Sequence, residues 1–419
     1  MQYGLIGEHL GHSYSCEIHG KIADYKYELK EIAPEDLDAF MREASFKAIN
    51  VTIPYKQAVI PYLYEISSQA EEIGAVNTVV NHDGRLYGYN TDFMGMAALF
   101  EKMGVSLSGK KVLILGTGGT SKTAVAVAKD GGAREIIKVS RHAGTDGDVV
   151  PVVTYEEAVA KHSDAEIIIN TTPSGMYPNV ENVPIDVSAF KNLEGVLDAV
   201  YNPLRTNLVL DAHEHGVAAE GGLYMLAGQA VYASAEFQDI DIDKTLIDVA
   251  YRTVRDKKRN LVMTGMPSSG KTTVGKLLAE KMGLKFVDTD DLIVEKIGCS
   301  ISDFMHAHGE KAFRDVESEV IKGIASESGM VIATGGGAVL RSENIRALKR
   351  NGVVIFLDRA LENLITTDDR PLSSSREALE KRYSERIDIY RGTADIIVDA
   401  NTTLNEEVED ILSKLQGDA

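Results

Sequence analysis

The fold of this chain is decided by one stretch, Gly265-Met266-Pro267-Ser268-Ser269-Gly270-Lys271-Thr272, which fits the pattern G-x-x-x-x-G-K-[ST] of a phosphate-binding loop, the P-loop. The apolar residues 261–263 precede it and predict a buried strand, and residues 273–282 follow with helical composition. In that context the backbone N–H groups of the loop and the helix N-terminus surround a β-phosphate, because they are unpaired donors. The second part of the chain is therefore predicted to bind a nucleoside triphosphate.

The side chains of this loop add to the phosphate site. Lys271 places a positive charge between the β- and γ-phosphates, and Thr272 offers a hydroxyl to Mg²⁺. Residues 286–290 predict a strand that delivers Asp288 and Asp290 on one side, where Mg²⁺ and a substrate hydroxyl need carboxylates. The candidate nucleotide-binding residues are Gly265, Ser268, Ser269, Gly270, Thr272 and Thr273.

The chain has 419 residues, which is too long for one hydrophobic core and predicts two or three domains. Its formal net charge of −19 argues against nucleic acid or an anionic membrane as the main partner. No run approaches about 18 uncharged apolar residues, and the first residues lack the features of a signal peptide. Because its two cysteines, Cys16 and Cys299, lie far apart, we expect reduced thiols and a cytoplasmic protein.

Polar residues follow the strands predicted in the first 100 residues. Taken one at a time each has a structural explanation, since Ser and Thr cap helices and Asn and Asp occupy turns. As a set they offer hydroxyl, amide and carboxylate groups that suit a small polyhydroxylated acid: Ser13, Ser15, Thr52, Asn77 and Asp92. Lys56 stands just after Pro54, which ends a predicted strand, and it forms a candidate acid/base pair with Asp92.

Residues 110–115 predict a strand that meets the turn Gly116-Thr117-Gly118-Gly119, and a helix is predicted over residues 120–129. This is the pattern of a dinucleotide-binding turn in which small residues, Ser121 and Ala124, take the place of the third glycine. The next strand leads to Arg141, which fits the 2′-phosphate of NADP better than the ribose of NAD. The candidate cofactor-binding residues are Gly116, Gly118, Gly119, Thr120, Ser140 and Arg141.

Two helices are predicted between residues 221 and 254, and Gln229 stands beside the apolar stripe of the first. The basic string at residues 255–259 is interpreted as a short solvated connector.

Seven motifs follow one another in the first 250 residues: GLIG with HSYS, NVTIPYK, GAVNT, GYNTD, GTGGTSKTA, NTTPSGM with DAVYNPLRT, and GGLYMLAGQA. Their order closely resembles shikimate dehydrogenase, which reduces 3-dehydroshikimate to shikimate with NADPH. The resemblance implies that Lys56 protonates the developing alkoxide, that Asp92 fixes Lys56, and that Tyr201 lies near the reacting centre. It also implies a set of residues that hold the substrate: Ser13, Ser15, Thr52, Lys56, Asn77, Asp92 and Gln229. The chain departs from the family at Cys16 and Gly20, where Pro and Asn are usual, and this concerns the packing behind the two serines.

The second part carries the P-loop, then DTD (residues 288–290), FRDVE (residues 313–317), GGG (residues 335–337), RPL (residues 370–372) and a late arginine. This order resembles shikimate kinase over residues 259–419. The resemblance implies that Asp288 supports Mg²⁺ with Thr272, and that Asp290 orients or deprotonates the 3-hydroxyl of shikimate. It implies that Arg370, in a candidate lid, acts with Lys271 on the γ-phosphate. The residues implied to hold shikimate are Arg314, Gly336, Gly337 and Arg386.

Together these patterns predict an α/β protein, with an N-terminal α/β substrate domain and a Rossmann-type NADP domain followed by a P-loop kinase domain with a parallel sheet. The expected bounds are residues 1–100, completed by the helices of residues 221–254, then residues 101–220 and residues 255–419. The chain is expected to be a bifunctional enzyme whose first product, shikimate, is its second substrate. NADP(H), ATP and Mg²⁺ are the expected cofactors, and only small-molecule substrates are expected as partners.

Two alternatives stay open from the sequence. In one, only the kinase is active and the first part is a degenerate or regulatory module, which the presence of Lys56 and Asp92 disfavours. In the other, the dehydrogenase prefers quinate with NAD⁺, which Arg141 disfavours.

Overall fold

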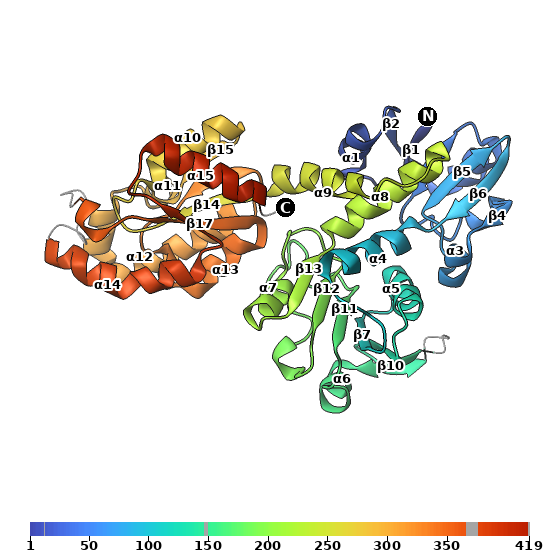
Figure 1. The fold of residues 1–419 in the computed structure, drawn as a ribbon, viewed down its shortest axis with the longest axis horizontal. Coiled ribbons are helices and arrows are strands. Elements are labelled where there is room, and N and C mark those ends of the chain that lie inside the picture. The colour runs from blue at the N-terminus through green and yellow to red at the C-terminus, as the bar shows by residue number, and fades with distance from the viewer. Residues whose placement is uncertain (12, 146–149, 366–375, 418–419) are drawn as a thin grey trace. The chain divides into compact units, whose positions relative to one another are not determined.

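The computed structural model describes residues 1–11, 13–145, 150–365 and 376–417. Contacts divide the chain into two compact units, Met1–Arg255 and Asp256–Ala419 (Figure 1). The hydrophobic clusters respect this division, because each cluster draws its buried residues from one unit alone. Each unit is described by itself below.

The first unit begins with a six-stranded mixed sheet in the order β2-β1-β3-β5-β6-β4. Its strands are β1 (Tyr3–Gly7), β2 (Tyr27–Glu31), β3 (Ala48–Val51), β4 (Glu65–Ile66), β5 (Thr78–His82) and β6 (Arg85–Tyr89). β1 pairs in parallel with β2 and β3, whereas β5 is antiparallel to β3 and β6. The turn Asp83-Gly84, with both residues at positive φ, closes the hairpin between β5 and β6.

Helices from two distant parts of the sequence pack with this sheet. The first part supplies α1 (Ser15–Ile22), η1 (Pro34–Asp36), α2 (Leu37–Glu43), η2 (Ile60–Tyr62), α3 (Ser68–Ile73) and α4 (Thr91–Met103). The later helices are α8 (Leu223–Gln238) and α9 (Thr245–Lys258), and α8 packs along α4. Glycines make this approach close: a Cβ atom on Gly95 of α4 would lie 2.4 Å from the carbonyl oxygen of Met225.

The second sheet has seven strands in the order β13-β12-β11-β7-β8-β10-β9. They are β7 (Lys111–Leu115), β8 (Glu135–Ser140), β9 (Gly144–Thr145), β10 (Pro151–Thr154), β11 (Ile167–Asn170), β12 (Gly195–Asp198) and β13 (Ala218–Gly221). The helices are α5 (Gly119–Asp130), α6 (Tyr155–Lys161), η3 (Val187–Ala189) and α7 (Asn207–Glu214). β7 pairs in parallel with β8 on one side and β11 on the other, so the strand order reverses there. Open α/β sheets bind ligands beyond the carboxyl ends of the strands at such a point.

Alternation of side chains along β7 explains why helices cover both faces of this sheet. Val112 and Ile114 join the cluster that contains the inner residues of α5, whereas Leu113 and Leu115 join the cluster that contains those of α6 and α7. All five residues of β7 are buried. A strand that is buried on both faces reads as a continuous apolar run, as residues 112–115 do here.

The second unit holds a five-stranded parallel sheet in the order β15-β16-β14-β17-β18. Its strands are β14 (Asn260–Thr264), β15 (Lys285–Asp288), β16 (Met330–Ala333), β17 (Gly352–Asp358) and β18 (Ile396–Asp399). Its helices are α10 (Lys271–Met282), α11 (Thr289–Ile297), α12 (Ile301–Ala325), η4 (Ala338–Leu340), α13 (Ser342–Asn351), η5 (Leu361–Asn363), α14 (Arg376–Thr393) and α15 (Leu404–Gly417). α10 and α15 cover one face, and α12 and α13 cover the other (Figure 1).

The sequence-based fold class, α/β with parallel sheets, is confirmed. Two local interpretations were wrong. Residues 255–259 are no solvated connector, because α9 continues to Lys258 and the side chains of Arg255, Lys258 and Arg259 are buried. The strand predicted over residues 286–290 ends at Asp288, so Asp290 lies in the first turn of α11.

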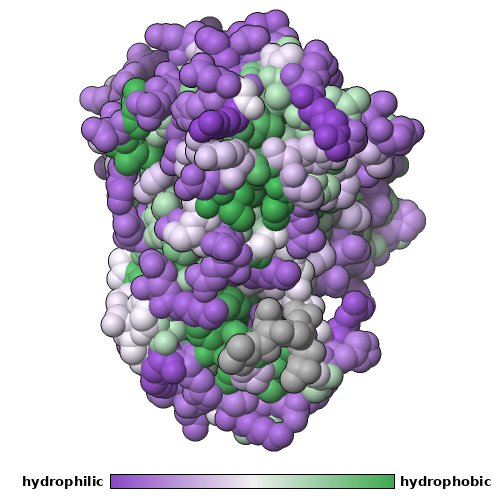
Figure 2. All heavy atoms as spheres, turned by 90° about the vertical axis from the view of Figure 1, so that its right-hand side faces the viewer, coloured by the Kyte–Doolittle hydropathy of each residue, from purple (hydrophilic) through white to green (hydrophobic). Residues whose placement is uncertain are grey.

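Hydrophilic side chains cover most of the face of the first unit drawn in Figure 2, and hydrophobic atoms show only in separate areas between them. Within the described residues, no helix combines the length and the apolar composition needed to cross a membrane.

Candidate active sites

The first unit contains a cavity of about 340 Å³ whose wall combines polar and apolar groups. β1, β3 and the segments that follow them supply part of this wall, together with Asn77 just before β5, and α4, α8 and the loop after β12 supply the rest. The structure brings all eight predicted substrate residues of this unit into the one cavity: Ser13, Ser15, Thr52, Lys56, Asn77, Asp92, Tyr201 and Gln229.

An ion pair lies on the wall of this cavity. Nζ of Lys56 donates to Oδ2 of Asp92 at 2.5 Å, and the two side chains are 32% and 20% exposed. Asp92 stands in the first turn of α4, where the helix dipole favours a carboxylate, and Asn90 caps that helix by accepting from the N–H of Phe93. The chain thus presents a carboxylate-held ammonium group that can donate a proton to a ligand oxygen.

Hydrogen bonds to its side-chain amide oxygen hold Asn77 in one orientation. Its Oδ1 accepts from the backbone N–H of Thr91 at 2.7 Å and from the hydroxyls of Thr78 and Thr91 at 3.1 and 3.2 Å. This fixes the amide so that its NH₂ group is the part left for a ligand. On the same wall the Ser13 hydroxyl donates to the Ser15 hydroxyl at 3.0 Å, so both serines point to one place.

Sequence reasoning missed Tyr14, Asn50 and Leu226, which also line this cavity. Asn50 is 4% exposed within β3; its Oδ1 accepts from the Tyr27 hydroxyl and its Nδ2 donates to the Thr78 hydroxyl. A polar residue inside an apolar strand pattern is the signal that could have identified it, since a buried amide needs partners.

The glycine turn lies at the carboxyl end of β7, where the strand order reverses. Gly116 has φ +105°, and a Cβ atom there would lie 2.9 Å from Oγ1 of Thr171, so only glycine fits. Gly118 caps α5, and neither it nor Gly119 has an atom within 4 Å of its Cβ position, which leaves the helix N-terminus open. Ser121 is fully buried, and its hydroxyl donates to the Gly118 carbonyl at 2.6 Å.

The neighbouring strand brings the other predicted cofactor residues to the same edge. β8 ends at Ser140, and Arg141 follows with an exposed side chain. Thr120 lies in the first turn of α5. An open helix N-terminus beside an exposed guanidinium group fits a dinucleotide that carries an extra phosphate.

A buried carboxyl group organises the loops that follow β11 and β12. Oδ1 of Asp198 accepts from Nδ2 of Asn170 at 2.9 Å and from the N–H of Val200 at 3.0 Å, and Oδ2 accepts from the Thr206 hydroxyl at 2.5 Å. Burial raises the pKa of Asp198 to about 6, although these three donors oppose the rise. The network holds the start of the loop that carries Tyr201 to the cavity wall.

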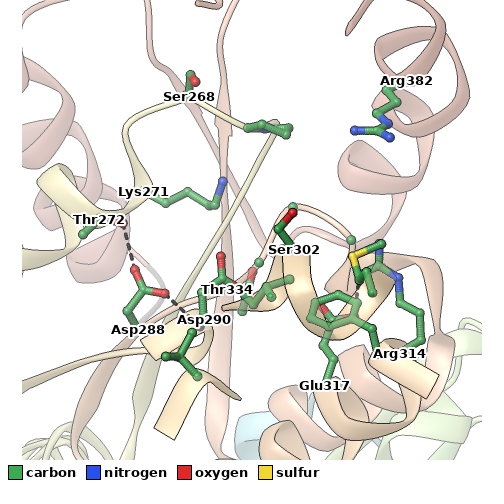
Figure 3. A pocket seen from close by; sticks show the side chains of 18 of the residues that line it. Ser268, Lys271, Thr272, Asp288, Asp290, Ser302, Arg314, Glu317, Thr334 and Arg382 are labelled. Atoms are coloured by element: carbon green, nitrogen blue, oxygen red, sulfur yellow. Dashed lines mark hydrogen bonds and ion pairs between the residues drawn. The ribbon is translucent and has the colours of Figure 1, made fainter. Parts of the chain in front are cut away.

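The second unit contains a larger cavity of about 840 Å³ around the P-loop (Figure 3). The cavity wall includes most of the predicted kinase residues: Ser268, Gly270, Lys271, Thr272, Thr273, Asp288, Asp290, Arg314, Gly336, Gly337 and Arg386. Two predicted nucleotide residues lie behind the wall, because Gly265 and Ser269 do not line it. Arg370 and the candidate lid around it lie outside the described residues.

One end of this cavity carries a hydroxyl and a carboxylate beside a lysine. The Thr272 hydroxyl donates to Oδ2 of Asp288 at 2.9 Å, and Oδ1 of Asp288 accepts from the N–H of Asp290 (Figure 3). Nζ of Lys271 donates to the carbonyl oxygens of Gly265 and Met266. Hydroxyl and carboxylate oxygens are ligands that suit Mg²⁺, which commonly takes few protein ligands and completes its shell with phosphate and water.

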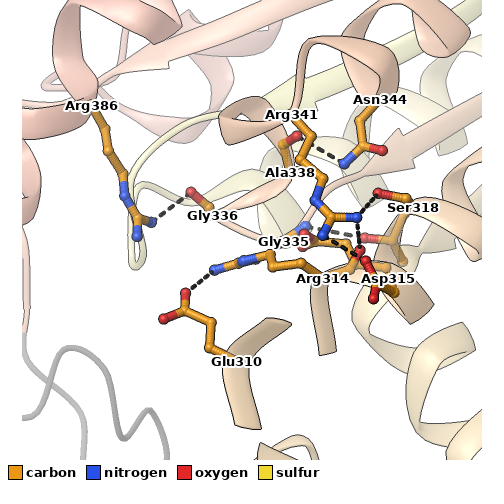
Figure 4. Close-up of polar contacts among 12 residues, drawn as sticks. Glu310, Arg314, Asp315, Ser318, Gly335, Gly336, Ala338, Arg341, Asn344 and Arg386 are labelled. Atoms are coloured by element: carbon orange, nitrogen blue, oxygen red, sulfur yellow. Dashed lines mark hydrogen bonds and ion pairs between the residues drawn. The ribbon is translucent and has the colours of Figure 1, made fainter. Parts of the chain in front are cut away.

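Glycines and arginines form the other end (Figure 4). A Cβ atom on Gly337 would lie 2.1 Å from the Arg314 guanidinium, so the glycine makes room for it. Nη1 of Arg314 donates to Oε2 of Glu317 at 2.8 Å, and Nη2 donates to Oε1 of Glu310 at 3.1 Å. Arg386 donates to the Gly336 carbonyl at 3.0 Å.

Sequence reasoning missed Glu317 and Arg382 on this wall. Glu317 is fully buried, and burial raises its pKa although Arg314 opposes the rise. Its place three residues after Arg314 on a helix is the signal that could have identified it, since positions i and i+3 lie on one face.

Two family models match the chain. One, described as the shikimate dehydrogenase substrate binding domain, matches residues 5–79, and one, described as shikimate kinase, matches residues 267–416. Shikimate dehydrogenase (NADP(+)) of Clostridium beijerinckii is 36% identical over 261 residues, which cover 59% of this chain and 96% of the relative.

Solved structures resemble the first unit as well. A chorismate mutase/shikimate 5-dehydrogenase fusion protein from Clostridium acetobutylicum has a TM-score of 0.56 and 36% identity, over 60% of this chain and 96% of that one. Shikimate 5-dehydrogenase from Thermus thermophilus, in complex with NADP(H) and shikimate, has a TM-score of 0.53 and 27% identity, over 60% of this chain and 98% of that one.

The first part of the chain matches a curated relative at 36% identity over nearly the whole length of that relative, and the shikimate kinase model covers most of Asp256–Ala419. The chain therefore belongs to the shikimate dehydrogenase family and continues into a shikimate kinase domain, which makes it a bifunctional enzyme of the shikimate pathway.

Proposed function

We propose that the first unit reduces 3-dehydroshikimate to shikimate with NADPH and that the second unit phosphorylates shikimate at its 3-hydroxyl with ATP and Mg²⁺. The proposal rests on one observation: each unit gathers its own set of reactive side chains on one cavity wall. The ion pair of Lys56 and Asp92 supports proton transfer in the first cavity. The pair of Thr272 and Asp288 beside Lys271 supports phosphoryl transfer in the second.

In the dehydrogenase reaction, the predicted substrate residues would hold the hydroxyl groups and the carboxylate of the substrate. NADPH, held by the α5 N-terminus and Arg141, would supply the hydride. Lys56 would donate a proton from Nζ to the carbonyl oxygen as that oxygen becomes an alkoxide, and Asp92 would keep the ammonium group in place. General acid catalysis of this kind contributes roughly 10²–10⁴ in rate.

In the kinase reaction, Arg314, Arg386 and the backbone at Gly336 and Gly337 would hold the carboxylate and the ring of shikimate. Asp290 would orient the 3-hydroxyl or accept its proton. Thr272 and Asp288 would hold Mg²⁺, which would supply positive charge to offset the negative charge of the phosphates. Lys271, with Arg370 from the candidate lid, would stabilise the charge on the transferring phosphoryl group.

The domain arrangement that we propose has residues 1–100 with the helices of residues 221–254 as the substrate domain, residues 101–220 as the NADP domain and residues 255–419 as the kinase. The separate sheets support this division. A cytoplasmic site of action is supported by Cys16 and Cys299, which are both free thiols.

The alternative of a quinate-preferring dehydrogenase that uses NAD⁺ is disfavoured by the exposed Arg141, which suits a 2′-phosphate. The alternative of a regulatory first unit is disfavoured by the ion pair of Lys56 and Asp92, which a binding module would not need. Comparing rates of shikimate and quinate oxidation with NADP⁺ and with NAD⁺ decides between these possibilities and the proposal.

The test of the whole proposal is one incubation of purified protein with 3-dehydroshikimate, NADPH, ATP and Mg²⁺, with the products identified by mass spectrometry. We expect shikimate 3-phosphate. Two variants separate the steps: Lys56→Met should slow the conversion of 3-dehydroshikimate roughly 10²–10⁴-fold, whereas Lys271→Met should accumulate shikimate. Wild-type protein that stops at shikimate contradicts the kinase assignment, and wild-type protein that leaves 3-dehydroshikimate untouched contradicts the dehydrogenase assignment.

A further inference from the structure

A third arginine lies on the wall of the kinase cavity. Arg382 of α14 lines the cavity together with Arg314 and Arg386, and its guanidinium group points toward the cavity in Figure 3. Neither the resemblance nor the chemistry of phosphoryl transfer assigns it a role.

Arg382 and Arg386 are four residues apart on one helix. Such residues share a helix face, with about 5–6 Å between their Cβ atoms. Arg386 is 7% exposed and donates to the Gly336 carbonyl, whereas Arg382 is only partly buried. Both side chains line the cavity that the glycine segment of residues 335–337 also lines, and the positive charge of Arg386 acts on Arg382.

The charges at this end of the cavity leave a place for an anion. Arg314 is bound by two carboxylates, Glu317 and Glu310, which between them match or exceed its single positive charge. Because Arg314 shares its charge with two glutamates, a substrate carboxylate at this end gains from further positive charge beside Arg314. Arg382 and Arg386 of α14 line the same cavity and add that charge.

The charges around Arg382 also favour the binding of an anion. Burial lowers the pKa of its guanidinium group, and the positive charges of Arg386 and Arg314 lower it further, whereas Glu310 and Glu385 raise it. Arginine stays charged despite such shifts. Crowded cations of this kind are stabilised when an anion binds among them.

We propose that Arg382 is a substrate-binding residue of the kinase, which contacts the carboxylate of the hydroxy acid jointly with Arg386. The inference rests on the proposed function and adds a specificity determinant to it. Arg386 holds the carboxylate from the glycine side and Arg382 holds it from the side nearer the start of α14. The site thereby selects an anionic ring acid over a neutral polyol of the same shape.

The test compares shikimate with its methyl ester, which keeps the hydroxyl groups and lacks the negative charge. We expect Arg382→Leu to raise the KM for shikimate roughly 10- to 100-fold, as the loss of a charge-assisted hydrogen bond does, with the KM for ATP unchanged. The KM for the ester should change little, and Arg382→Lys should recover part of the loss. Lys381→Leu, on the exposed face of the same helix, is the matched control and should behave as wild type.

Two results would overturn the inference. One is an unchanged KM for shikimate in Arg382→Leu. The other is an equal rise for the acid and the ester, which would show that Arg382 only supports the fold through its glutamate neighbours. Thermal unfolding of each variant identifies a folding defect. If the wild-type enzyme itself does not phosphorylate shikimate, the proposed function fails, and the inference fails with it.

Discussion

Gly228 of α8 lies directly against Gly95 of α4: a Cβ atom on Gly228 would come within 3.1 Å of the Cα atom of Gly95. The same contact would bring a Cβ on Gly95 to 2.9 Å from the backbone nitrogen of Gln229. Because Asp92 begins α4 and Gln229 belongs to α8, this glycine contact sets the distance between two residues of the dehydrogenase cavity.

Adding one methyl group at this contact should damage the first active site. Gly95→Ala forces α4 and α8 apart, and overpacking of this kind costs about 1–3 kcal/mol. We expect a lower unfolding temperature of the first unit and a raised KM for shikimate, measured with NADP⁺, while kinase activity is unchanged. Gly20→Ala is the control, since no atom lies within 4 Å of its Cβ position. Equal behaviour of the two variants would contradict the argument.

Removing the ammonium group of Lys56 should slow the dehydrogenase without loosening the fold. Lys56→Met keeps the length of the side chain and removes the proton donor, so kcat should fall roughly 10²–10⁴-fold with a smaller change in KM. Steady-state kinetics with NADPH measure this, and kinase activity is the internal control. Lys47→Met, at an exposed position of the same domain, should have wild-type rates. A KM effect alone would indicate that Lys56 binds the substrate and transfers no proton.

A methyl group at Gly337 should disturb the kinase only. In Gly337→Ala the new Cβ would occupy the place of the Arg314 guanidinium, so Arg314 must leave its contacts with Glu317 and Glu310. We expect the KM for shikimate to rise at least roughly tenfold, since a charged hydrogen bond is lost. Gly392→Ala, which meets nothing within 4 Å, should be neutral. A normal KM in Gly337→Ala would show that Arg314 binds no substrate.

His19 should make the first unit sensitive to acid. The imidazole is fully buried, its ring stacks on Tyr27 at 3.9 Å between centroids, and Nδ1 shares a hydrogen bond with the Tyr25 hydroxyl. Burial lowers the pKa of His19 from 6.5 to about 3. Between these values the unfolded chain binds a proton that the folded chain excludes, so the stability present above pH 6.5 is lost as the pH falls toward 3.

The loss attributable to His19 approaches about 1.4 kcal/mol per pH unit below pH 6.5. Urea unfolding of the dehydrogenase unit between about pH 4 and pH 7 measures it. His19→Phe keeps the stacking and should flatten the slope, although it lowers stability at neutral pH because Tyr25 loses its partner. His142→Phe, at an exposed site, should keep the wild-type slope. Parallel slopes for wild type and His19→Phe would refute the assignment.

Local patterns were sufficient for much of this structure. The strand, loop and helix around the P-loop appear at β14 and α10, and the glycine turn lies between β7 and α5, because each motif places chemically distinct residues at fixed spacing within one turn. The eight substrate residues of the first cavity also share one wall, although they come from segments as far apart as Ser13 and Gln229.

The features that the sequence did not predict depend on helix phase and on tertiary contacts. Arg382 looks like an ordinary surface residue until the helix phase of α14 places it on the cavity side, and Glu317 gains its importance from burial. Asp290 was assigned to a strand because both carboxylates follow apolar residues, whereas Asp288 caps the helix that carries Asp290. The basic composition of residues 255–259 led to the prediction of a solvated connector. The aliphatic parts of Lys and Arg side chains can nevertheless be buried along apolar surface.

The separate hydrophobic clusters of the two units have a consequence for how this gene can change over time. Substitutions that share no contacts have additive effects, so a mutation that weakens one core is not amplified by a mutation in the other. Selection therefore acts on two nearly independent targets within one reading frame. A lineage that obtains one of the two steps from another gene could let that half drift, while the other half keeps its fold and its activity.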